Sequence, residues 1–449
     1  MATSVMWFRR DLRLSDNPAL GAAKDAGDEG VVPLFVLDDR LWEPAGPSRR
    51  AYLAASLSDL SERVGGMHVV HGDPVQEVVR VARQAGASTV HVAADYAPYG
   101  SERDQAVEKA LAEHDVELVR TGSPYAVAPG RVLKGDGTPF KVYTPFNRAW
   151  KEHGWRAPAA DVRDVPWLRP EGRTHQIPDV TLPDGLELRT AGEAAARKQW
   201  RDWIDPGLAE YDDTRNDPGA DRTSRMSVHL KWGEIHPRTM LADIAEHHSE
   251  GADAYQREIC FREFYADVLH HNPHTAREYY NPQFAGMTYD KPGDDLEAWK
   301  QGRTGFPVVD AGLRQLRAEG WMHNRVRMIV ASFLVKDLHL EWQLGARHFL
   351  HWLVDGDLAS NQHGWQWMAG CGTDAAPYFR IFNPTTQGKK FDPDGAYVRR
   401  YVPELADVDA KKIHEPWTLD DGPPNGYPPP LVDHKEERVE SLERYQAIK

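Results

Sequence analysis

The chain has 449 residues, of which 41% are hydrophobic and 27% charged, a balance typical of soluble globular proteins. This length is too great for one ordinary hydrophobic core, so we expect two domains or three. The net charge of -14 argues against a protein that coats nucleic acid without specificity, because phosphate contacts need Lys and Arg side chains.

Membrane, exported and metal-centred proteins are also disfavoured. No run of about 18 apolar residues could span a bilayer, and the first residues lack the apolar core and cleavage site of an export signal. The only cysteines, Cys260 and Cys371, have neither a metal-ligand spacing nor a disulfide framework. These features predict a reduced protein of the cytoplasm with no metal site.

The first 125 residues alternate between apolar, β-branched runs and helical patterns. Strands are expected at 5–8, 31–37, 67–70, 89–92 and 116–119, and helices at 49–64, 75–84 and 102–112. Such alternation predicts a doubly wound parallel sheet, a Rossmann-like α/β domain. The first strand is followed by FRRDLRLSDNP and not by G-x-G-x-x-G, so a dinucleotide site of the usual kind is not expected there.

Five prolines and little periodicity indicate that residues 155–190 form a linker. From residue 191 onward helix formers dominate, so we predict an all-helical second domain. Its helices are expected at 252–270, 307–319, 324–334 and 345–353, with a short charged helix in the tail. The expected boundaries are 1–130 for the α/β domain, 131–195 for the linker, 196–430 for the helical domain and 431–449 for the tail.

Residues 211–238 contain hydroxyl and cationic side chains ahead of a helical run. These are Thr223, Ser224, Arg225 and Ser227. They would bring donors to a helix N-terminus, where free N–H groups and the helix dipole suit a pyrophosphate. Ordinary helix capping by Ser or Thr explains the same residues and is the favoured interpretation of this cluster alone.

Two further patterns can be explained either by a functional role or by ordinary surface charge. Basic residues concentrate at 312–327 and 378–401 with few carboxylates; a DNA-binding patch and scattered solvated charge are equally good interpretations of either stretch. Glu258 and Arg262 share one face of an expected helix, which alone indicates an ordinary surface ion pair.

Residues 355–388 combine carboxylates with tryptophans. Asp355 and Asp357 could form an acid–base pair, or accept hydrogen bonds from a ligand or from Arg327. If the segment is helical, Trp365 and Trp367 would face roughly opposite ways. No nucleophile elbow, phosphate loop or zinc motif accompanies them, so a hydrolase is not expected.

Taken together, these segments resemble the photolyase/cryptochrome family. The resemblance begins at WFRRDLRLSDNPAL (7–20) and is densest in TSRMS, REFY, TGFPVVDAGLRQL, GWMHNRVRM, DGDLASN and GTDAAPYFRIFNP. Several independent motifs in the family's order leave little room for chance. The chain looks most like a class I cyclobutane pyrimidine dimer photolyase, which implies an α/β domain joined by a long linker to a helical FAD domain.

The resemblance implies one FAD, folded into a U shape in the helical domain and active as the fully reduced anion. Arg327 and Asp355 would pair beside the flavin. Asn361 would face its reactive ring nitrogen, where an amide can hydrogen-bond the reduced and protonated forms. The positions matching the family's FAD contacts are Tyr211, Thr223, Ser224, Arg225, Met226, Ser227, Tyr255, Glu258, Arg262, Trp321, Asn324, Arg327, Asp355, Asp357 and Asn361.

The implied reaction is light-driven repair of cyclobutane pyrimidine dimers in single- or double-stranded DNA. Excited reduced FAD would give an electron to a dimer flipped out of the helix, the ring would split, and the electron would return. Glu258 would hydrogen-bond a thymine carbonyl, and Gln387 would lie in a loop near the strand. The matching DNA and lesion positions are Arg215, Glu258, Phe261, Asn324, Arg325, Met328, Trp367 and Gln387, the two arginines holding phosphates.

The sequence departs from the family at two positions. Phe261 replaces a dimer-stacking tryptophan, and its smaller ring predicts weaker lesion affinity. The family also reduces its flavin through three tryptophans, of which Trp365 and Trp342 match the inner two. The outermost position aligns with Tyr289, and a tyrosine can end such a relay only by losing its proton on oxidation. Either Tyr289 does so, or another surface aromatic takes the role.

Relatives often hold an antenna pigment in the α/β domain. The stretch ADYAPYGSERD (94–104), together with Lys231, looks more like the type that binds 8-hydroxy-5-deazaflavin than the type that binds methenyltetrahydrofolate. Asp95 and Lys231 would contact the pigment. We further expect a monomer with no obligate protein partner and no membrane association.

Three other functions are weighed against repair. A signalling cryptochrome is disfavoured because many such relatives carry Asp or Cys at the position of Asn361, and because little chain follows the last family motif. Repair of the (6-4) photoproduct normally needs a histidine pair; His323 is near the expected lesion positions, but a second partner is not apparent. A flavin oxidoreductase acting in the dark would need a nicotinamide or substrate motif, which the sequence does not offer.

Overall fold

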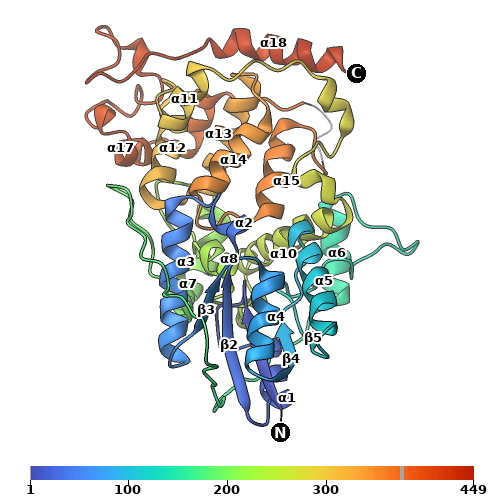
Figure 1. The fold of residues 1–449 in the computed structure, drawn as a ribbon. Helices are drawn as coiled ribbons and strands as arrows, with labels where there is room; N and C mark the ends of the chain where they lie inside the picture. Colours follow the sequence, from blue (N-terminus) through green and yellow to red (C-terminus); the bar gives the residue numbers. More distant parts are fainter. Residues whose placement is uncertain (1, 375–378) are drawn as a thin grey trace. The chain divides into compact units, whose positions relative to one another are not determined.

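The computed structural model describes residues 2–374 and 379–449, and the chain divides into two compact units (Figure 1). Unit 1 comprises Met1–Pro183, Arg189–Ala209 and Ser224–Pro273. Unit 2 comprises Asp184–Leu188, Glu210–Thr223 and His274–Lys449. Unit 1 thus includes residues 224–273, which we expected in the helical domain that begins at residue 196. The domain boundaries expected from the sequence stay a prediction.

Unit 1 is built around a five-stranded sheet with the strand order β3-β2-β1-β4-β5, and all its strand pairs are parallel. The side chains of β1 and β2 are buried along their whole length, as expected for central strands covered on both faces. The predicted doubly wound α/β fold is therefore confirmed. The strands are β1 (Thr3–Phe8), β2 (Gly30–Leu37), β3 (His68–His71), β4 (Ala87–Val92) and β5 (Glu117–Arg120).

Helices connect these strands, and four of them begin with a proline at the first helical position, where its missing N–H costs nothing. Right-handed crossovers place α1 and α3 on one face of the sheet and α4 and α5 on the other. Helix α1 was not predicted from the sequence. The connecting helices are α1 (Pro18–Ala26), α2 (Asp39–Trp42), α3 (Pro47–Arg63), α4 (Pro74–Gln84) and α5 (Pro98–Ala112).

The remainder of unit 1 is helical apart from the proline-rich segment. Residues 154–192 contain no helix, and they are linked to the sheet by the bridge of Trp167 to Val31 and by the His175 N–H, which donates to the Val69 carbonyl of β3 at 2.7 Å. The longest helix that lies wholly in this unit, α10, is capped by Ser249, whose side chain accepts from the Ala252 N–H. The helices are α6 (Tyr143–His153), α7 (Glu193–Thr214, which continues into unit 2), α8 (Ser227–Trp232), α9 (Pro237–Ile244) and α10 (Glu250–His271).

Unit 2 is all-helical, as predicted. Its central helix, α13, packs against α12, α14, α15, α16 and α18, and its second half is buried almost without interruption. The N-terminal end of α13 carries the polar residues of the GWMHNRVRM motif. The α-helices are α11 (Asp294–Gln301), α12 (Pro307–Glu319), α13 (Asn324–Lys336), α14 (Trp342–Trp352), α15 (Leu358–Ala369), α16 (Pro384–Phe391), α17 (Ala396–Tyr401) and α18 (His434–Ala447).

Short 3-10 helices complete unit 2: η1 (Pro273–Ala276), η2 (Pro282–Gly286), η3 (Pro403–Leu405) and η4 (Pro416–Thr418). Among the helices of residues 2–374 and 379–449, none is long and apolar enough to cross a membrane.

Candidate active site

The first group of predicted site residues lies in unit 2 around the N-terminal end of α13. Arg327 donates from Nη2 to Asp355 Oδ2 at 2.8 Å and from Nε to the Met322 carbonyl at 2.8 Å. The Asp355 side chain is only 2% exposed, so its charge is balanced by this buried ion pair. The guanidinium also lies over the Trp321 ring, 5.9 Å from its centre. The expected pairing of Arg327 with Asp355 is thus present.

Asp357 and Asn361 lie at the beginning of α15. Asp357 is the N-cap, and its carboxylate accepts from the Ser360 N–H at 3.1 Å. Asn361 donates from its amide nitrogen to the Ala346 carbonyl at 3.1 Å and to Gln362 Oε1 at 2.8 Å. Because two acceptors fix the amide orientation, the Asn361 group that stays available for a ligand in the described part of the chain is the carbonyl oxygen, an acceptor.

The predicted inner relay residues, Trp365 on α15 and Trp342 on α14, are both buried. The Trp365 ring presses against α14 at Gly345, where an added Cβ would lie 2.1 Å from Cη2 of the indole. Gly345 and Trp342 are three residues apart and so share one helix face. The indole N–H groups of both tryptophans have no hydrogen-bond partner within residues 2–374 and 379–449. The two rings are therefore joined through α14 and not by direct ring stacking.

Trp367 lies on the other side of α15 and is half-buried. Its indole N–H donates to the Asp374 carbonyl at 3.2 Å, and the Arg380 guanidinium lies 5.7 Å from its ring centre. An aromatic ring held beneath a cation can receive a base by stacking. The residues just before Phe379, part of the GTDAAPYFRIFNP motif, lie outside the described residues.

Arg325 stands in an electropositive environment. It donates to Asn216 Oδ1 from Nη2 at 2.6 Å and from Nε at 3.2 Å. Burial, followed by the charges of Arg215 and Arg380, lowers the pKa of Arg325. Arg215 in turn lies over the Tyr211 ring. Three arginines whose charges act on one another form a field that favours phosphate oxygens.

Two expectations for unit 2 change. Gln387 was expected in a loop, but it lies in helix α16, which begins at Pro384 and is capped by Asn383; the Pro after a capping Asn is a helix-start signal that was overlooked. His323, weighed as a histidine for (6-4) repair, is 2% exposed and caps α13 by accepting from the Arg325 N–H. Asn324 and Met328 lie in the first turns of α13, as expected from the motif.

The TSRMS segment crosses the boundary between the units. Thr223, the last residue of its stretch in unit 2, has a buried hydroxyl with no hydrogen-bond partner among the described residues. In unit 1, Ser224 Oγ lies 2.7 Å from the Tyr255 hydroxyl. Arg225 adopts a left-handed φ of 52°, a strained conformation for a non-glycine residue. Helix α8 begins at Ser227 with the buried Met226 at its N-cap position, which has no side chain capable of capping.

Residues of α10 were also expected at the flavin. Glu258 is half-buried on this helix. Arg262 donates to the backbone carbonyls of Pro124 at 3.0 Å and Leu230 at 3.4 Å, and lies over the Tyr125 ring. Arg262 therefore has a structural task inside unit 1, and its role at the flavin stays a prediction.

Phe261, the departure from the family's tryptophan, is not an open ring. Tyr143 of α6 stacks on it with 3.4 Å between ring centres and 6° between planes. The Tyr143 hydroxyl donates to the Arg257 carbonyl at 2.9 Å, which holds the stack in place. One face of Phe261 is thus covered by protein, so at most the other face can receive a base.

The expected antenna residue Asp95 follows the C-terminal end of β4. In the strand order β3-β2-β1-β4-β5, strands β2 and β3 are added on one side of β1 and strands β4 and β5 on the other. Ligands of open α/β sheets bind outside the C-terminal strand ends at such a switch point. Arg103 donates to Asp95 at 3.4 Å, and the guanidinium groups of Arg9 and Arg103 both lie over the Trp7 ring of β1. Lys231 lies in α8 with its ammonium over the Trp232 ring.

Comparison with known proteins decides the family. Residues 4–164 match the family model described as DNA photolyase, and residues 255–447 match the FAD binding domain of DNA photolyase. Along its length the chain is 42% identical to the deoxyribodipyrimidine photo-lyase of Streptomyces griseus, covering 98% of both chains. The enzyme of the same name from Escherichia coli is 37% identical, covering 100% of this chain and 99% of its own.

The chain belongs to the DNA photolyase family.

Solved structures agree with this assignment. A class III photolyase from Agrobacterium tumefaciens superposes with a TM-score of 0.94 at 36% identity, covering 100% of this chain and 98% of its own. A cryptochrome from Synechocystis has a TM-score of 0.91 at 25% identity, covering 99% of each chain. An archaeal photolyase from Sulfolobus tokodaii, solved with two FAD molecules, has a TM-score of 0.86 at 27% identity, covering 99% of this chain and 100% of its own. A class III photolyase and a cryptochrome share this fold, so the class I prediction does not follow from the fold.

Sequence reasoning missed two residues of this photolyase that the structure brings into the described groups. Arg380 was counted in a basic stretch but not assigned to the site, because nothing in the sequence places it over Trp367. Tyr279 was not considered, although its ring lies 6.3 Å from that of Trp342 and 6.3 Å from that of Tyr289. The sequence alone allows an aromatic residue other than Tyr289 to end the relay, and a search for that residue could have led to Tyr279.

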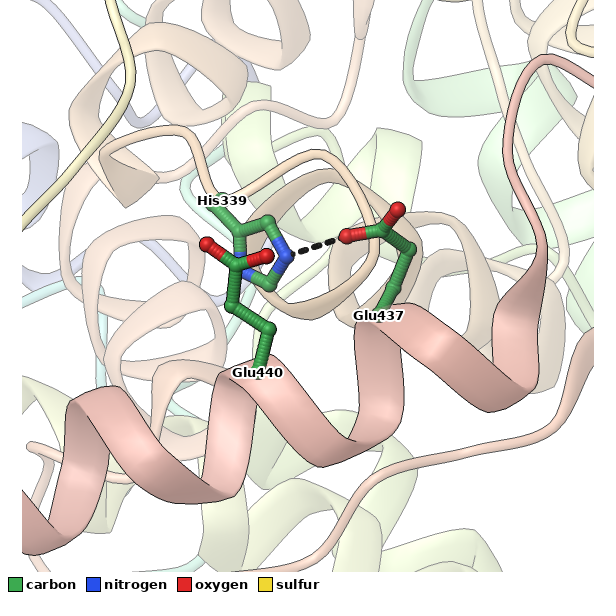
Figure 2. A group of neighbouring side chains, drawn as sticks. All are labelled: His339, Glu437 and Glu440. Atoms are coloured by element: carbon green, nitrogen blue, oxygen red, sulfur yellow. Dashed lines mark hydrogen bonds and ion pairs between the residues drawn. The ribbon is translucent and has the colours of Figure 1, made fainter.

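A separate cluster in unit 2 joins His339 to Glu437 and Glu440 of α18 (Figure 2). The ligand atoms lie within 4.8 Å of one another, a spacing that could hold a cation. However, His339 Nε2 is hydrogen-bonded to Glu437 at 2.7 Å, and Glu440 accepts from Arg444 Nε at 2.9 Å. The three side chains already have protein partners, so we assign the cluster to fastening α18 and not to metal binding.

Proposed function

We propose that this protein uses blue light to repair cyclobutane pyrimidine dimers in DNA, through a bound and fully reduced FAD. The observation that carries the proposal is the composition of α15. One helix presents the Asn361 carbonyl oxygen, a buried Trp365 and a half-buried Trp367 beneath Arg380. A flavin contact, an electron supply and a surface for a base therefore share one rigid element.

The residues of unit 2 fit a flavin. A fully reduced flavin carries ring N–H groups that need acceptors, and the Asn361 oxygen is an acceptor fixed in place by two bonds at its nitrogen. The Thr223 hydroxyl, buried without a partner in the described residues, suits an FAD phosphate oxygen. Arg327 and Asp355 place a balanced charge pair where the ring is proposed to lie. The FAD contacts expected in unit 1 stay predictions.

The excited flavin supplies the electron, and the protein supplies position and electrostatics. Arg215, Arg325 and Arg380 are proposed to hold the DNA backbone near the lesion. Trp367 offers one ring face to a base of a dimer turned out of the duplex, because aromatic stacking needs no particular base. A dimer is already poorly paired, which lowers the cost of turning it out. The capping role of His323 does not support (6-4) repair.

A second pigment is proposed at the C-terminal ends of β1 and β4. A deazaflavin remains the favoured type, with Asp95 and Lys231 as contacts, and a folate is the alternative. The archaeal relative solved with two FAD molecules adds FAD itself as a third candidate. Protein expressed with each pigment in turn would distinguish them by an absorption band beyond that of one flavin per chain.

The proposal further includes a monomer that works on DNA in the cytoplasm without an obligate protein partner. Sedimentation with and without dimer-bearing DNA tests this part. A concentration-dependent dimer of the chain in the absence of DNA would contradict it.

The deciding experiment illuminates chemically reduced, FAD-loaded protein with an oligonucleotide bearing one thymine dimer. Recovery of thymine absorbance in light, and none in darkness, is expected. The same protein mixed with an oligonucleotide bearing a (6-4) photoproduct should restore nothing. Absence of thymine recovery in light, with FAD bound and reduced, would overturn the repair proposal and favour a signalling role like that of a cryptochrome.

A further inference from the structure

Tyr279 occupies the gap between two residues of the predicted relay. Its ring is nearly perpendicular to that of Trp342, at 83°, and roughly parallel to that of Tyr289, at 21°, with ring centres 6.3 Å apart in both pairs. Tyr279 is 8% exposed. Among the described residues the Trp342 ring makes no direct contact with the Tyr289 ring, so the aromatic path from α14 toward Tyr289 passes through Tyr279.

The position of Tyr279 is set by the polar side chains of α15. Gln366 donates to the Thr275 carbonyl at 2.9 Å and accepts from the Tyr280 N–H at 2.7 Å. Gln362 donates to the Ala276 carbonyl at 2.6 Å. These bonds tie the backbone on both sides of Tyr279 to the helix that carries Trp365. The ring is therefore held relative to the relay and does not depend on loop packing alone.

The two inner tryptophans and Tyr279 differ in what can accept a proton. The indole N–H groups of Trp365 and Trp342 are buried and lack an acceptor within residues 2–374 and 379–449. An indole that loses an electron there keeps its proton. The Tyr279 hydroxyl, in contrast, donates to Glu341 Oε1 at 3.2 Å, and Glu341 is exposed to solvent.

The protonation state of Tyr279 adds to this contrast. Burial raises the pKa of Tyr279 to about 12, and the negative charge of Glu341 also raises it, while the neighbouring Tyr289 lowers it. The phenol is therefore protonated at neutral pH, and its oxidation must release a proton. A carboxylate at hydrogen-bond distance, open to water on its other side, is a suitable acceptor.

We propose that Tyr279 is the residue at which the electron relay becomes coupled to proton release, with Glu341 as the proton acceptor. Tyr279 gives one electron to oxidised Trp342, which becomes neutral again. In the same step its O–H bond breaks and the proton moves to Glu341, leaving a neutral tyrosyl radical and a neutral carboxylic acid. Glu341 then releases the proton to water, and an external thiol returns one electron and one proton to the tyrosyl oxygen.

This inference rests on the proposed photoreduction of FAD but not on DNA repair itself. Tyr289 stacks on Tyr279 and can share the unpaired electron, but it is not the first tyrosine to be oxidised. Trp299, whose ring lies 6.2 Å from that of Trp365, is a competing branch. It is fully buried and its N–H donates to the Val330 carbonyl at 3.4 Å, and a carbonyl is not a base, so this branch cannot release a proton.

The test compares four variants of the full, FAD-loaded chain: Tyr279→Phe, Tyr289→Phe, Glu341→Gln and Tyr280→Phe. Tyr280 is the matched control, a neighbouring half-buried tyrosine outside the ring path. Illuminated oxidised protein is examined by electron paramagnetic resonance, and flavin bleaching is followed with a thiol in H₂O and D₂O. We expect Tyr279→Phe to remove the tyrosyl signal and to slow bleaching about tenfold, while Tyr280→Phe changes neither.

Glu341→Gln should keep Tyr279 in place but slow tyrosyl formation several-fold and change the solvent isotope effect. In flavin-free protein, ultraviolet titration of the phenols should show a lower pKa for Tyr279 in Glu341→Gln, because the negative charge is gone. A normal tyrosyl signal in Tyr279→Phe, or its loss in Tyr289→Phe alone, would overturn the proposal. Repair by chemically reduced Tyr279→Phe separates the relay hypothesis from the repair hypothesis. If repair is absent in every form, including wild type, the proposed function is refuted, and the result on the relay still stands.

Discussion

Trp365 and Trp367 are two residues apart on α15, yet they have opposite surroundings. Trp365 is 3% exposed and packs against Phe349 and the bare backbone of Gly345. Trp367 is half-buried beneath the Arg380 guanidinium. Two positions on a helix differ by roughly 200°, so one element presents an apolar, uncharged side and a cationic side. The contrast teaches that electron supply and DNA recognition can be separated by single substitutions on or beside α15.

The largest expected effect is that of Trp365→Phe. A benzene ring is far harder to oxidise than an indole, so we expect photoreduction of FAD to slow by about a hundredfold or more, equal to about 2.7 kcal/mol in activation free energy. Repair of dimers by chemically reduced protein should change little, because the relay is not used. Bleaching of the flavin under blue light measures the first effect, and thymine recovery measures the second.

Trp299→Phe is the matched control, since Trp299 is also fully buried and its ring touches Trp365. It should leave photoreduction near the wild-type rate. If Trp299→Phe slows photoreduction as much as Trp365→Phe does, the relay does not follow α14. The proposed role of the Trp365 side of α15 in electron supply would then be wrong.

Much of this architecture could be predicted from the sequence. Each of the five strands was located, because apolar β-branched runs have few other uses, and α12 was placed with its correct bounds. The pairing of Arg327 with Asp355 came from family motifs. Helix α1 was missed because its nine residues, four of which are Ala, carry a weak apolar pattern.

Other tertiary contacts could not be predicted. Nothing in the sequence shows that Tyr143 covers Phe261, since the two residues are 118 positions apart and their rings stack only in the fold. The same holds for Arg380 and for Tyr279, whose roles depend on what lies beside them. Gln387 was placed in a loop by the family resemblance, and the helix-start signal of Asn383 and Pro384 was overlooked.

Gly345→Ala tests how closely Trp365 depends on α14. The added Cβ would lie 2.1 Å from the Trp365 ring and 2.6 Å from Leu334, and such overpacking costs about 1–3 kcal/mol. Ala is the better helix former by about 1 kcal/mol, so the net loss in the free energy of unfolding should be roughly 0–2 kcal/mol. Photoreduction should slow as the ring is displaced.

Gly364→Ala on α15 provides the control, because a Cβ there would meet no atom within 4 Å. This variant should gain up to about 1 kcal/mol from helix propensity alone. Urea unfolding gives the free energy of unfolding of both variants. The difference between the two values isolates the cost of the steric overlap, because both substitutions gain the same helix propensity. Equal stabilities of the two variants would show that Trp365 is loosely held.

The smallest effect is expected on the cationic side, from Arg325→Gln. Asn216 holds this guanidinium, and the charges of Arg215 and Arg380 act on it, so removing it weakens a shared field and not the only phosphate contact. We expect affinity for dimer-bearing DNA to fall about tenfold at low salt, and the slope of log affinity against log salt to decrease by about one. Photoreduction should be unchanged in Arg325→Gln, whereas Trp365→Phe is expected to slow it.

Arg314→Gln is the control for Arg325→Gln, because Arg314 belongs to the same basic stretch but is neutralised by Glu404 at 2.6 Å. Its removal should leave DNA affinity and the salt slope as in wild type. Equal losses in both variants would mean that the basic stretch acts as diffuse charge. A loss confined to Arg325→Gln would instead mean that affinity comes from Arg325 itself, within the field that it shares with Arg215 and Arg380.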